Sequence, residues 1–523
     1  MQEYTNTSTS SQNNKRIAKN TIMLYFRMIL TMLVSLYTSR MVLNMLGVED
    51  YGTYNVVGGV VSLLGFFNGA MASATQRFLS FDLGRKDYEQ LRKTFNATQV
   101  VHVCIAVLVL VLAETFGLWF VNNYLNIPEG RMEAARWVYH FSVLSFMVNI
   151  IQVPYNALII AREQMSVYAY VSILEVALKL LVAFMLTWIA YDKLKLYAVL
   201  LFGVSVIVAA IYRLYTRRHF EETKYLLVKD STLYKTLISY SGWNLFGGMA
   251  GVAKGQGVSI ILNIFFGTVV NAAQGVANQV NGAINSFVTN FQMASNPQII
   301  KSYAADDKAY MTNLVIRTSK FSFYLLFMLT LPVMLEIDYI LKIWLKIVPD
   351  YTATFTILIL INALIDTVSG PLVTSLHATG RIKTYQLTVA IMLILILPIT
   401  YVLFKLNYPP QYTYFVSISI SIFALSMRLF ITKKQIPEFS ISLFLREIIF
   451  RNIPILIISI SIPLLLKINM DPCFLRLIIV SLMSVICSIT TYYFWGLNNN
   501  EKKVFRNFII LYYKRFMTSK HTK

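Results

Sequence analysis

Seven amide and hydroxyl side chains recur at helical spacing between residues 271 and 298. They fall every three or four residues and so share one side of a helix: Gln274, Asn278, Asn281, Asn285, Thr289, Gln292 and Asn296. An unpaired amide facing hydrocarbon is costly, so such a stripe either joins helices by hydrogen bonds or lines a water-filled path. Seven polar residues exceed what helix joining needs. We therefore expect the five amides at 274, 278, 281, 285 and 292 to bind a hydrophilic substrate.

Three of the basic side chains inside long apolar segments could face a substrate path. Arg27 lies about 12 Å from the start of the first segment, at 1.5 Å per residue. Arg40 lies near the C-terminal end of the same segment, and Lys254 lies in the C-terminal half of the segment at 238–264. Together they could form a cationic lining for an anionic group such as a pyrophosphate. The alternatives are that Arg40 reaches the membrane interface, and that Arg27 and Lys254 pair with a carbonyl or an acid.

Two of the acidic side chains in apolar segments are candidates for ion coupling. Asp366 shares a helix face with Asn362 and Ser369. A buried carboxylate there could bind a proton or Na⁺ and couple transport to an ion gradient, or it could equally serve as a counter-charge for Lys254 or Arg27. Glu175 is a second candidate for ion coupling. Lys179 stands four residues from it, however, and would neutralise it in a purely structural pair.

The sequence offers no arrangement suited to catalysis or metal binding. Its five histidines lack ligand spacing, and its three cysteines form no CxxC pair. Lys254 is followed by Gly255 and Gln256, which do not fit a phosphate-binding loop. We therefore expect no enzymatic activity, no cofactor and no metal.

The composition requires membrane helices to position these residues. Of 523 residues 56% are hydrophobic and only 14% charged, with mean hydropathy +0.59. A soluble domain carries about 25% charged residues, so a soluble enzyme, a secreted disulfide scaffold and a disordered chain are excluded. The net charge of +21 then indicates cytoplasmic loops and anionic lipid rather than nucleic acid. We predict an all-α polytopic membrane protein.

Fourteen segments are long and apolar enough to cross a bilayer of about 30 Å. They cover residues 19–43, 53–76, 97–120, 136–160, 166–190, 195–213, 238–264, 271–298, 318–335, 353–376, 385–405, 411–430, 448–467 and 474–496. With the N-terminus inside, the inner loops hold about four times as many Lys and Arg as the outer loops, as the positive-inside rule requires. Both termini are therefore predicted to be cytoplasmic.

The chain contains a weak internal repeat. Tyr124-Leu125-Asn126-Ile127-Pro128 is similar to Trp344-Leu345-Lys346-Ile347-Val348-Pro349, a shift of 220 residues, and two other stretches match at offsets of 217 to 220. The offset spans six helices, so the repeats are parallel and would form two lobes with a substrate path between them. We predict a disordered cytoplasmic tail (1–18), a six-helix lobe (19–215), a cytoplasmic linker (216–236), a second six-helix lobe (237–431), two extra helices (432–497) and a basic cytoplasmic tail (498–523).

Four stretches carry a resemblance to a known family: Leu46-Gly47-Val48-Glu49-Asp50-Tyr51-Gly52, Arg77-Phe78-Leu79-Ser80 with Gly84-Arg85-Lys86-Asp87-Tyr88, Trp344-Leu345 with Pro349-Asp350-Tyr351, and residues 378–386 (ATGRIKTYQ). Here the chain resembles the lipid-linked oligosaccharide (O-antigen repeat-unit) flippases of the multidrug/oligosaccharidyl-lipid/polysaccharide exporter superfamily. The resemblance covers most of residues 15–430.

This resemblance implies a transporter of the bacterial inner membrane that works by alternating access. It would flip an undecaprenyl-pyrophosphate-linked glycan to the periplasmic leaflet for surface polysaccharide assembly, beside a polymerase and chain-length machinery. Arg27 suits the family's cationic cavity. The main alternative is an ion-coupled small-molecule or multidrug exporter of the same superfamily. A membrane polymerase or transferase is disfavoured by the short outer loops, and a two-lobed major-facilitator carrier would leave the last two helices unexplained.

Overall fold

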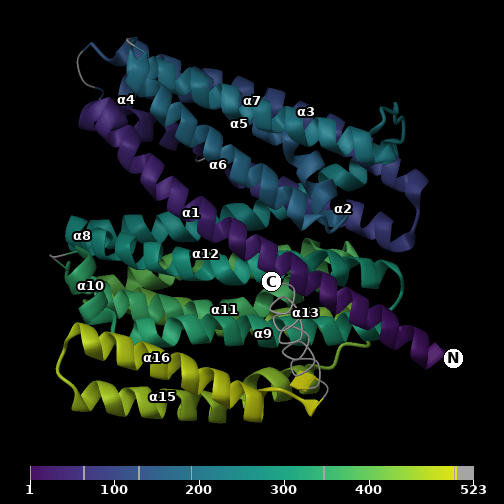
Figure 1. The fold of residues 1–523 in the computed structure, drawn as a ribbon, viewed down its shortest axis with the longest axis vertical. Coiled ribbons are helices and arrows are strands. Elements are labelled where there is room, and N and C mark those ends of the chain that lie inside the picture. The colour runs from purple at the N-terminus through teal and green to yellow at the C-terminus, as the bar shows by residue number, and fades with distance from the viewer. Residues whose placement is uncertain are drawn as a thin grey trace, which may run out of the picture. The chain divides into compact units, whose positions relative to one another are not determined.

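The computed structural model describes residues 2–62, 65–125, 127, 130–189, 191–345, 348–499 and 501–502. The part of the chain that it describes is helical and contains no strand (Figure 1). Most of the predicted tail at 498–523 therefore lies outside the described residues. The α-helices are Gln2–Ser62 (α1), Gly65–Arg85 (α2), Tyr88–Leu112 (α3), Leu118–Tyr124 (α4), Met132–Ala161 (α5), Met165–Trp188 (α6), Lys193–His219 (α7), Ser231–Ala304 (α8), Lys308–Leu335 (α9), Ile337–Leu345 (α10), Thr352–Thr379 (α11), Lys383–Lys405 (α12), Tyr412–Gln435 (α13), Ile441–Phe444 (α14), Asn452–Asn469 (α15) and Phe474–Thr491 (α16).

Four short helical segments interrupt or extend these helices. Glu221–Thr223 (η2) is a 3₁₀ turn, and the other three are π-helical: Ala113–Gly117 (η1), Leu445–Phe450 (η3) and Tyr492–Gly496 (η4). Each π-helical segment continues an α-helix. Three membrane-spanning lengths of helix include such a segment. They are α3 with η1 and α4, α14 with η3 and α15, and α16 with η4.

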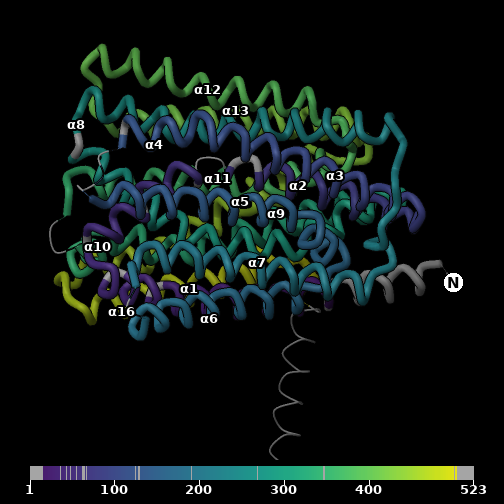
Figure 2. The backbone as a smooth tube through the Cα atoms, turned by 90° about the horizontal axis from the view of Figure 1, so that it is seen from above, coloured from purple at the N-terminus to yellow at the C-terminus, as the bar shows by residue number. Residues whose placement is uncertain are grey.

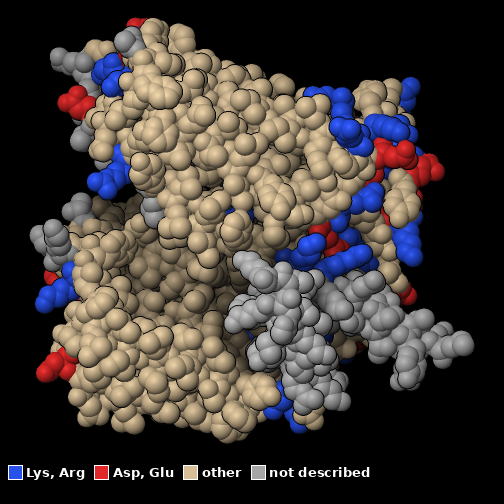
Figure 3. Space-filling model, in the orientation of Figure 1, with Lys and Arg blue, Asp and Glu red and all other residues tan. Residues whose placement is uncertain are grey.

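Twelve helices among the described residues are long and apolar enough to span a membrane. They confirm an all-helical polytopic fold, and they correspond to twelve of the fourteen predicted segments. The other two, at 53–76 and 271–298, are helical wherever the structure describes them but less apolar. The second of these contains the amide stripe, which lowers its hydropathy. On the face shown in Figure 3, charged side chains gather at helix ends and the band between them is almost uncharged, as lipid contact requires.

The helices form two compact units. The first comprises residues 1–255, 290–311 and 373–394, and the second comprises residues 256–289, 312–372 and 395–523. In the first unit α5 packs against α2, α3 and α7, and α1 packs against α6; the lengthwise run of these helices is visible in Figure 2. Burial of aliphatic side chains such as Leu158 and Leu186, both 0% exposed, holds this unit together.

In the second unit, α16 is fastened to α9 by aromatic and ionic contacts. The rings of Tyr324 and Tyr492 stack with centroids 4.2 Å apart. The Tyr324 hydroxyl donates a hydrogen bond to the Gly496 carbonyl, and the Tyr492 hydroxyl donates one to the Tyr324 carbonyl. A Cβ on Gly496 would lie 2.8 Å from the Tyr324 hydroxyl, so only glycine permits this approach. The last two spans are therefore an integral part of this unit.

The backbone repeats itself in the two halves of the sequence. Residues with positive φ recur at offsets of 217 to 220. The pairs are Gly47 with Gly267, Lys86 with Asp306, and Glu163 with Gly380. Each pair ends or breaks a helix at the corresponding place, because a left-handed residue stops the helical hydrogen-bond ladder. The internal repeat predicted from the sequence is thus present in the fold.

Gly267 breaks α8 with φ 77° and ψ −168°, a conformation that is essentially restricted to glycine. Gly267→Ala should therefore destabilise the protein by about 1–3 kcal/mol, although no atom lies within 4 Å of the added Cβ. Thermal unfolding in detergent measures the effect. Gly275→Ala is the matched control, since Gly275 is helical on the same element with open space around it. It should be neutral or slightly stabilising, and equal losses at both sites would show that backbone strain is not the cause.

Candidate substrate-binding site

Arg27 lies on α1 and contacts both α6 and α8. Its Nη2 donates a hydrogen bond to Asn290 Oδ1 at 3.0 Å, and its guanidinium carbon lies 4.8 Å from the centre of the Tyr168 ring. The amide of Asn290 is oriented by a contact of 3.3 Å from its Nδ2 to Met28 Sδ. Arg27 Nε is buried and has no hydrogen-bond partner among the described residues. The guanidinium thus keeps one buried donor that no group in the described part of the chain satisfies.

A small apolar cluster sets the register of α1 against α8 at this point. Leu24 and Ala294 are both 0% exposed and pack together with Ile160 and Met165. Leu24 lies one turn from Arg27, and Ala294 lies one turn from Asn290. Burial of this cluster therefore places the guanidinium opposite the amide.

Helix α6 presents a polar face to the same place. Tyr168, Ser172, Glu175 and Lys179 are spaced by four, three and four residues, and so share one side of the helix. Ser172 Oγ donates to the Tyr168 carbonyl at 2.8 Å, and the Ser172 side chain also hydrogen-bonds Tyr212 on α7. We call the following residues the Arg27 cluster: Arg27, Tyr168, Glu175, Lys179, Tyr212 and Asn290.

The Arg27 cluster carries a net positive charge. Lys179 Nζ donates to Glu175 Oε1 at 2.6 Å, and the two side chains are 44% and 38% exposed. This intrahelical pair is internally neutral, so Arg27 supplies the excess charge. Because Lys179 neutralises Glu175, this contact favours a purely structural pair over a role for Glu175 in ion coupling.

The amide stripe of α8 divides into residues that bond within the protein and residues that face open space. Gln274 is buried and accepts a hydrogen bond from Ser259 at 2.9 Å, and Asn296 accepts one from Thr374 at 3.0 Å. Asn278 is exposed, and Asn281 and Asn285 are half-buried. Asn281 Oδ1 is buried without a partner among the described residues. Gln292 is half-buried and has polar contacts of its own.

This division makes a direct test of the stripe possible. The double variant Asn278→Leu, Asn281→Leu should reduce transport about ten-fold or more, because each lost hydrogen bond to a substrate is worth about 0.5–1.5 kcal/mol. Its measurement is the uptake rate in proteoliposomes. Gln274→Leu is the control, and it should lower thermal stability through loss of the Ser259 bond. Unchanged transport by the double variant would mean that the stripe only joins helices.

The remaining predicted residues lie elsewhere. Arg40 is exposed on α1, thirteen residues beyond Arg27, which is about 20 Å along a helix; one phosphate cannot bridge the two. Lys254 is half-buried on α8 and has interactions within the protein. Asp366 is half-buried on α11 and accepts a hydrogen bond from Asn362 Nδ2 at 2.8 Å. One helix turn away, Ser369 accepts a hydrogen bond from Arg428 at 3.1 Å, so a basic residue that was not among the predicted site residues lies near this acid.

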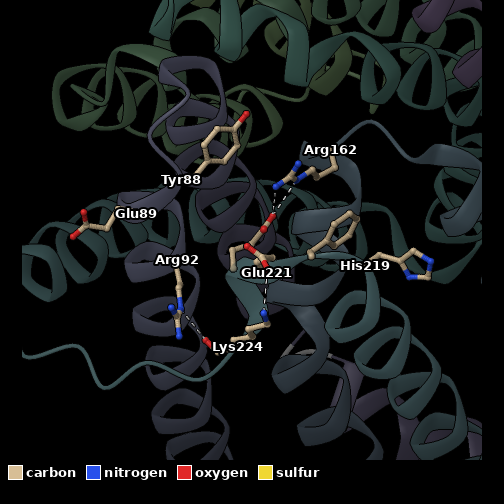
Figure 4. Close-up of a pocket in the computed structure, with 9 residues that line it drawn as sticks. Tyr88, Glu89, Arg92, Arg162, His219, Glu221 and Lys224 are labelled. Atoms are coloured by element: carbon tan, nitrogen blue, oxygen red, sulfur yellow. Dashed lines mark hydrogen bonds and ion pairs between the residues drawn. The ribbon is translucent and has the colours of Figure 1, made fainter.

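A cavity of about 510 Å³ lies at one end of the first unit (Figure 4). It is lined by Tyr88, Glu89, Arg92, Arg162, His219, Phe220, Glu221, Glu222 and Lys224. Its charges are matched within the chain. Arg162 pairs with Glu222 at 2.7 Å, Lys224 pairs with Glu221 at 3.1 Å, and Arg92 donates to the Lys224 carbonyl at 3.3 Å. These contacts fasten the linker after α7 onto α3 and α5, and none of the predicted site residues lies here.

Comparison with known proteins identifies the fold. Residues 24–185 match the MatE family model. The fold is that of the MATE transporters. An outward-facing multidrug resistance MATE family transporter of the MOP superfamily superposes with a TM-score of 0.70 at 10% identity, covering 82% of this chain and 97% of that chain. The MATE transporter VcmN of Vibrio cholerae, in a mutant form, gives a TM-score of 0.68 at 15% identity and covers 82% of this chain and 98% of that chain.

A third structure with the MATE fold differs in its described site. It is a MOP superfamily transporter from Pyrococcus furiosus whose binding pocket is described as having reverse polarity, suggesting a different function. Its TM-score is 0.67 at 9% identity, with 82% of this chain and 96% of that chain covered. No curated protein sequence matches the chain. The predicted all-helical, multi-pass architecture is confirmed at the level of the fold.

Proposed function

We propose that this MATE-fold protein is a membrane transporter of the MOP superfamily that exports an organic anion by alternating access. The observation that carries the proposal is the Arg27 cluster. Arg27 is a membrane-embedded guanidinium with one buried donor left unsatisfied, and it forms no ion pair with an acid in the part of the chain that the structure describes. An uncompensated cation among helices is costly, and such residues usually mark a substrate path.

The first candidate substrate is a small amphipathic molecule. The structural relatives include a transporter described as conferring multidrug resistance, which supports the exporter alternative drawn from the sequence. The transporter described as having a pocket of reverse polarity supports a charge preference that varies within this fold. For this chain the positive charge of Arg27 favours anionic substrates over the cationic ones that an acidic pocket would take.

The second candidate is a polyprenyl-pyrophosphate-linked oligosaccharide. Two separate features of the chain favour it: a guanidinium, suited to phosphate, and the open amides Asn278, Asn281 and Asn285 on α8, suited to sugar hydroxyls. The bacterial inner membrane, cytoplasmic termini, and a polymerase with its chain-length machinery as partners belong to this proposal. Asp366 remains the candidate for coupling to a proton or sodium gradient.

Transport by the purified protein in proteoliposomes tests both candidates. The probes are an amphipathic organic anion, an amphipathic organic cation of similar size, and a fluorescent polyprenyl-pyrophosphate oligosaccharide. We expect movement of an anionic probe and none of the cation. Movement of the small anion alone supports the exporter, and movement of the lipid-linked probe supports the flippase. Movement of the cation alone would overturn the charge argument.

A further inference from the structure

Arg77 on α2 binds the C-terminal end of α11, 300 residues away in the sequence. Its Nε and Nη2 donate hydrogen bonds to the carbonyls of His377 and Ala378, each at 3.0 Å. Helix α11 then stops at Gly380, which has φ 77°, and a Cβ there would lie 2.8 Å from Arg77 Nη2. The last carbonyls of a helix lack partners and carry partial negative charge. The Arg77 guanidinium supplies hydrogen-bond donors to these carbonyls and a positive charge that offsets their partial negative charge.

The surroundings of Arg77 exclude water. The side chain is 7% exposed, and its guanidinium lies 4.6 Å from the Phe78 ring centre, 4.7 Å from that of Phe81 and 5.6 Å from that of Tyr240. The Tyr240 hydroxyl, on α8, hydrogen-bonds His377 Nδ1 at 2.6 Å. Three helices, α2, α8 and α11, therefore meet through buried polar contacts.

A second polar contact also joins the side of one helix to the end of another, but here the side-chain donors come from the second repeat and the helix end from the first. Glu163 follows α5 with φ 59°, and its carboxylate accepts hydrogen bonds from Gln298 Nε2 at 2.6 Å and from Lys301 Nζ at 2.5 Å, both on α8. Burial lowers the pKa of the Lys301 ammonium, against the opposing attraction of Glu163. Glu163 and Gly380 are 217 residues apart, so they are equivalent positions of the internal repeat.

The two contacts together clasp the repeats to one another. In the Arg77 contact, α2 of the first repeat binds the end of α11 in the second repeat. In the Glu163 contact, α8 of the second repeat binds the end of α5 in the first repeat. Close packing of α2 on α8 joins them, since a Cβ on Gly84 would lie 2.6 Å from the Lys301 carbonyl and 2.8 Å from Ala304 Cβ. We call Arg77, Glu163, Gln298, Lys301, His377 and Ala378 the clasp. All of them belong to the first unit.

We propose that the clasp is a gate, and that Arg77 and the Glu163–Lys301 pair are gating residues that part and rejoin in every transport cycle. The inference rests on the proposed transport function. In alternating access each end of the path must open in turn, and the charge pattern predicts that the clasp end is cytoplasmic. A few hydrogen bonds and one ion pair suit a reversible closure, because each contributes only about 0.5–3 kcal/mol.

Cross-linking the clasp tests the proposal. Glu163→Cys and Lys301→Cys are combined in a chain carrying Cys104→Ala, Cys473→Ser and Cys487→Ala, and a short cross-linker that joins both thiols through disulfide bonds spans the site. We expect transport to fall at least ten-fold on cross-linking and to recover with reductant. The matched control joins Asn296→Cys to Thr374→Cys, whose parent side chains are 3.0 Å apart on two helices of the same repeat, and this link should leave transport unchanged. Full transport by the linked clasp would overturn the gate.

A labelling measurement reports gate opening without a transport assay. Ser80 lies on the face of α2 between Arg77 and Gly84 and is 0% exposed. In the same cysteine-free chain, Ser80→Cys should react slowly with a membrane-impermeant maleimide. Adding Glu163→Gln should raise the labelling rate several-fold, whereas adding Glu89→Gln, in an exposed pair with Lys93, should not. An unchanged rate with Glu163→Gln counts against the gate, and absence of transport by every variant, with labelling as expected, counts against the transport function alone.

Discussion

Arg27→Ala is expected to reduce export of an anionic substrate at least 30-fold while leaving insertion and folding intact. Loss of a desolvated charge that pairs with a substrate anion costs roughly 2–5 kcal/mol, and about 1.4 kcal/mol corresponds to a factor of ten. The measurement is the initial rate of probe movement in proteoliposomes, with thermal unfolding as a check on folding. Arg27→Lys keeps the charge but loses the planar fork of donors, and it should fall between the wild type and the alanine variant.

Arg40→Ala is the matched control, because Arg40 lies on the same helix and is exposed. Its replacement should change transport by no more than about two-fold, as is usual for exposed charges. A second comparison is Asn290→Leu, which removes the amide that orients the guanidinium and should weaken transport less than Arg27→Ala does. Full transport by Arg27→Ala would remove the Arg27 cluster from the mechanism.

The spans and the repeat could be predicted because hydropathy, charge and spacing are local properties of the sequence. Lipid imposes apolar runs, and loop charges follow from the membrane's asymmetry. The repeat was visible in weak motifs, and the fold adds the equivalent left-handed residues at 163 and 380. The helix at residues 48–62 could not be foreseen, since nothing in the sequence indicates that a helix starts again directly after the break at Gly47.

The site was only partly predictable, because the partners of a side chain depend on which helices pack together. Arg27 stood out as a charge in an apolar segment, but Asn290 lies one residue outside the predicted stripe and was missed. The polar spacing of Tyr168, Ser172 and Glu175 on α6 was a signal that could have been found. Arg77 lay in a stretch used only for the resemblance, and nothing local indicates that it caps a helix 300 residues later.

Arg476→Ala is expected to destabilise the second unit by about 3–5 kcal/mol. Arg476 Nη2 lies 2.8 Å from Glu336 Oε2, with the side chains 9% and 0% exposed, and its Nη1 donates to the Met470 carbonyl at 3.1 Å. Removing one member of a buried ion pair leaves the other charge without compensation. Here the remaining carboxylate of Glu336 would be fully enclosed beside the start of α16. The Arg476–Glu336 pair holds this end of α16 against the end of α9, and the Tyr324–Tyr492 stack holds α16 to α9 nearer its other end.

A double-mutant cycle separates the charge from the packing. Glu336→Gln combined with Arg476→Ala should recover much of the lost stability, because no buried charge is then left alone. Thermal unfolding in detergent gives each corner of the cycle, and Lys224→Ala, which breaks an exposed pair, should leave the midpoint unchanged. Equal losses in the single and double variants would contradict the charge explanation. Because this pair joins the start of α16 to the end of α9, a large effect would establish that the last two spans stabilise the rest of the second unit.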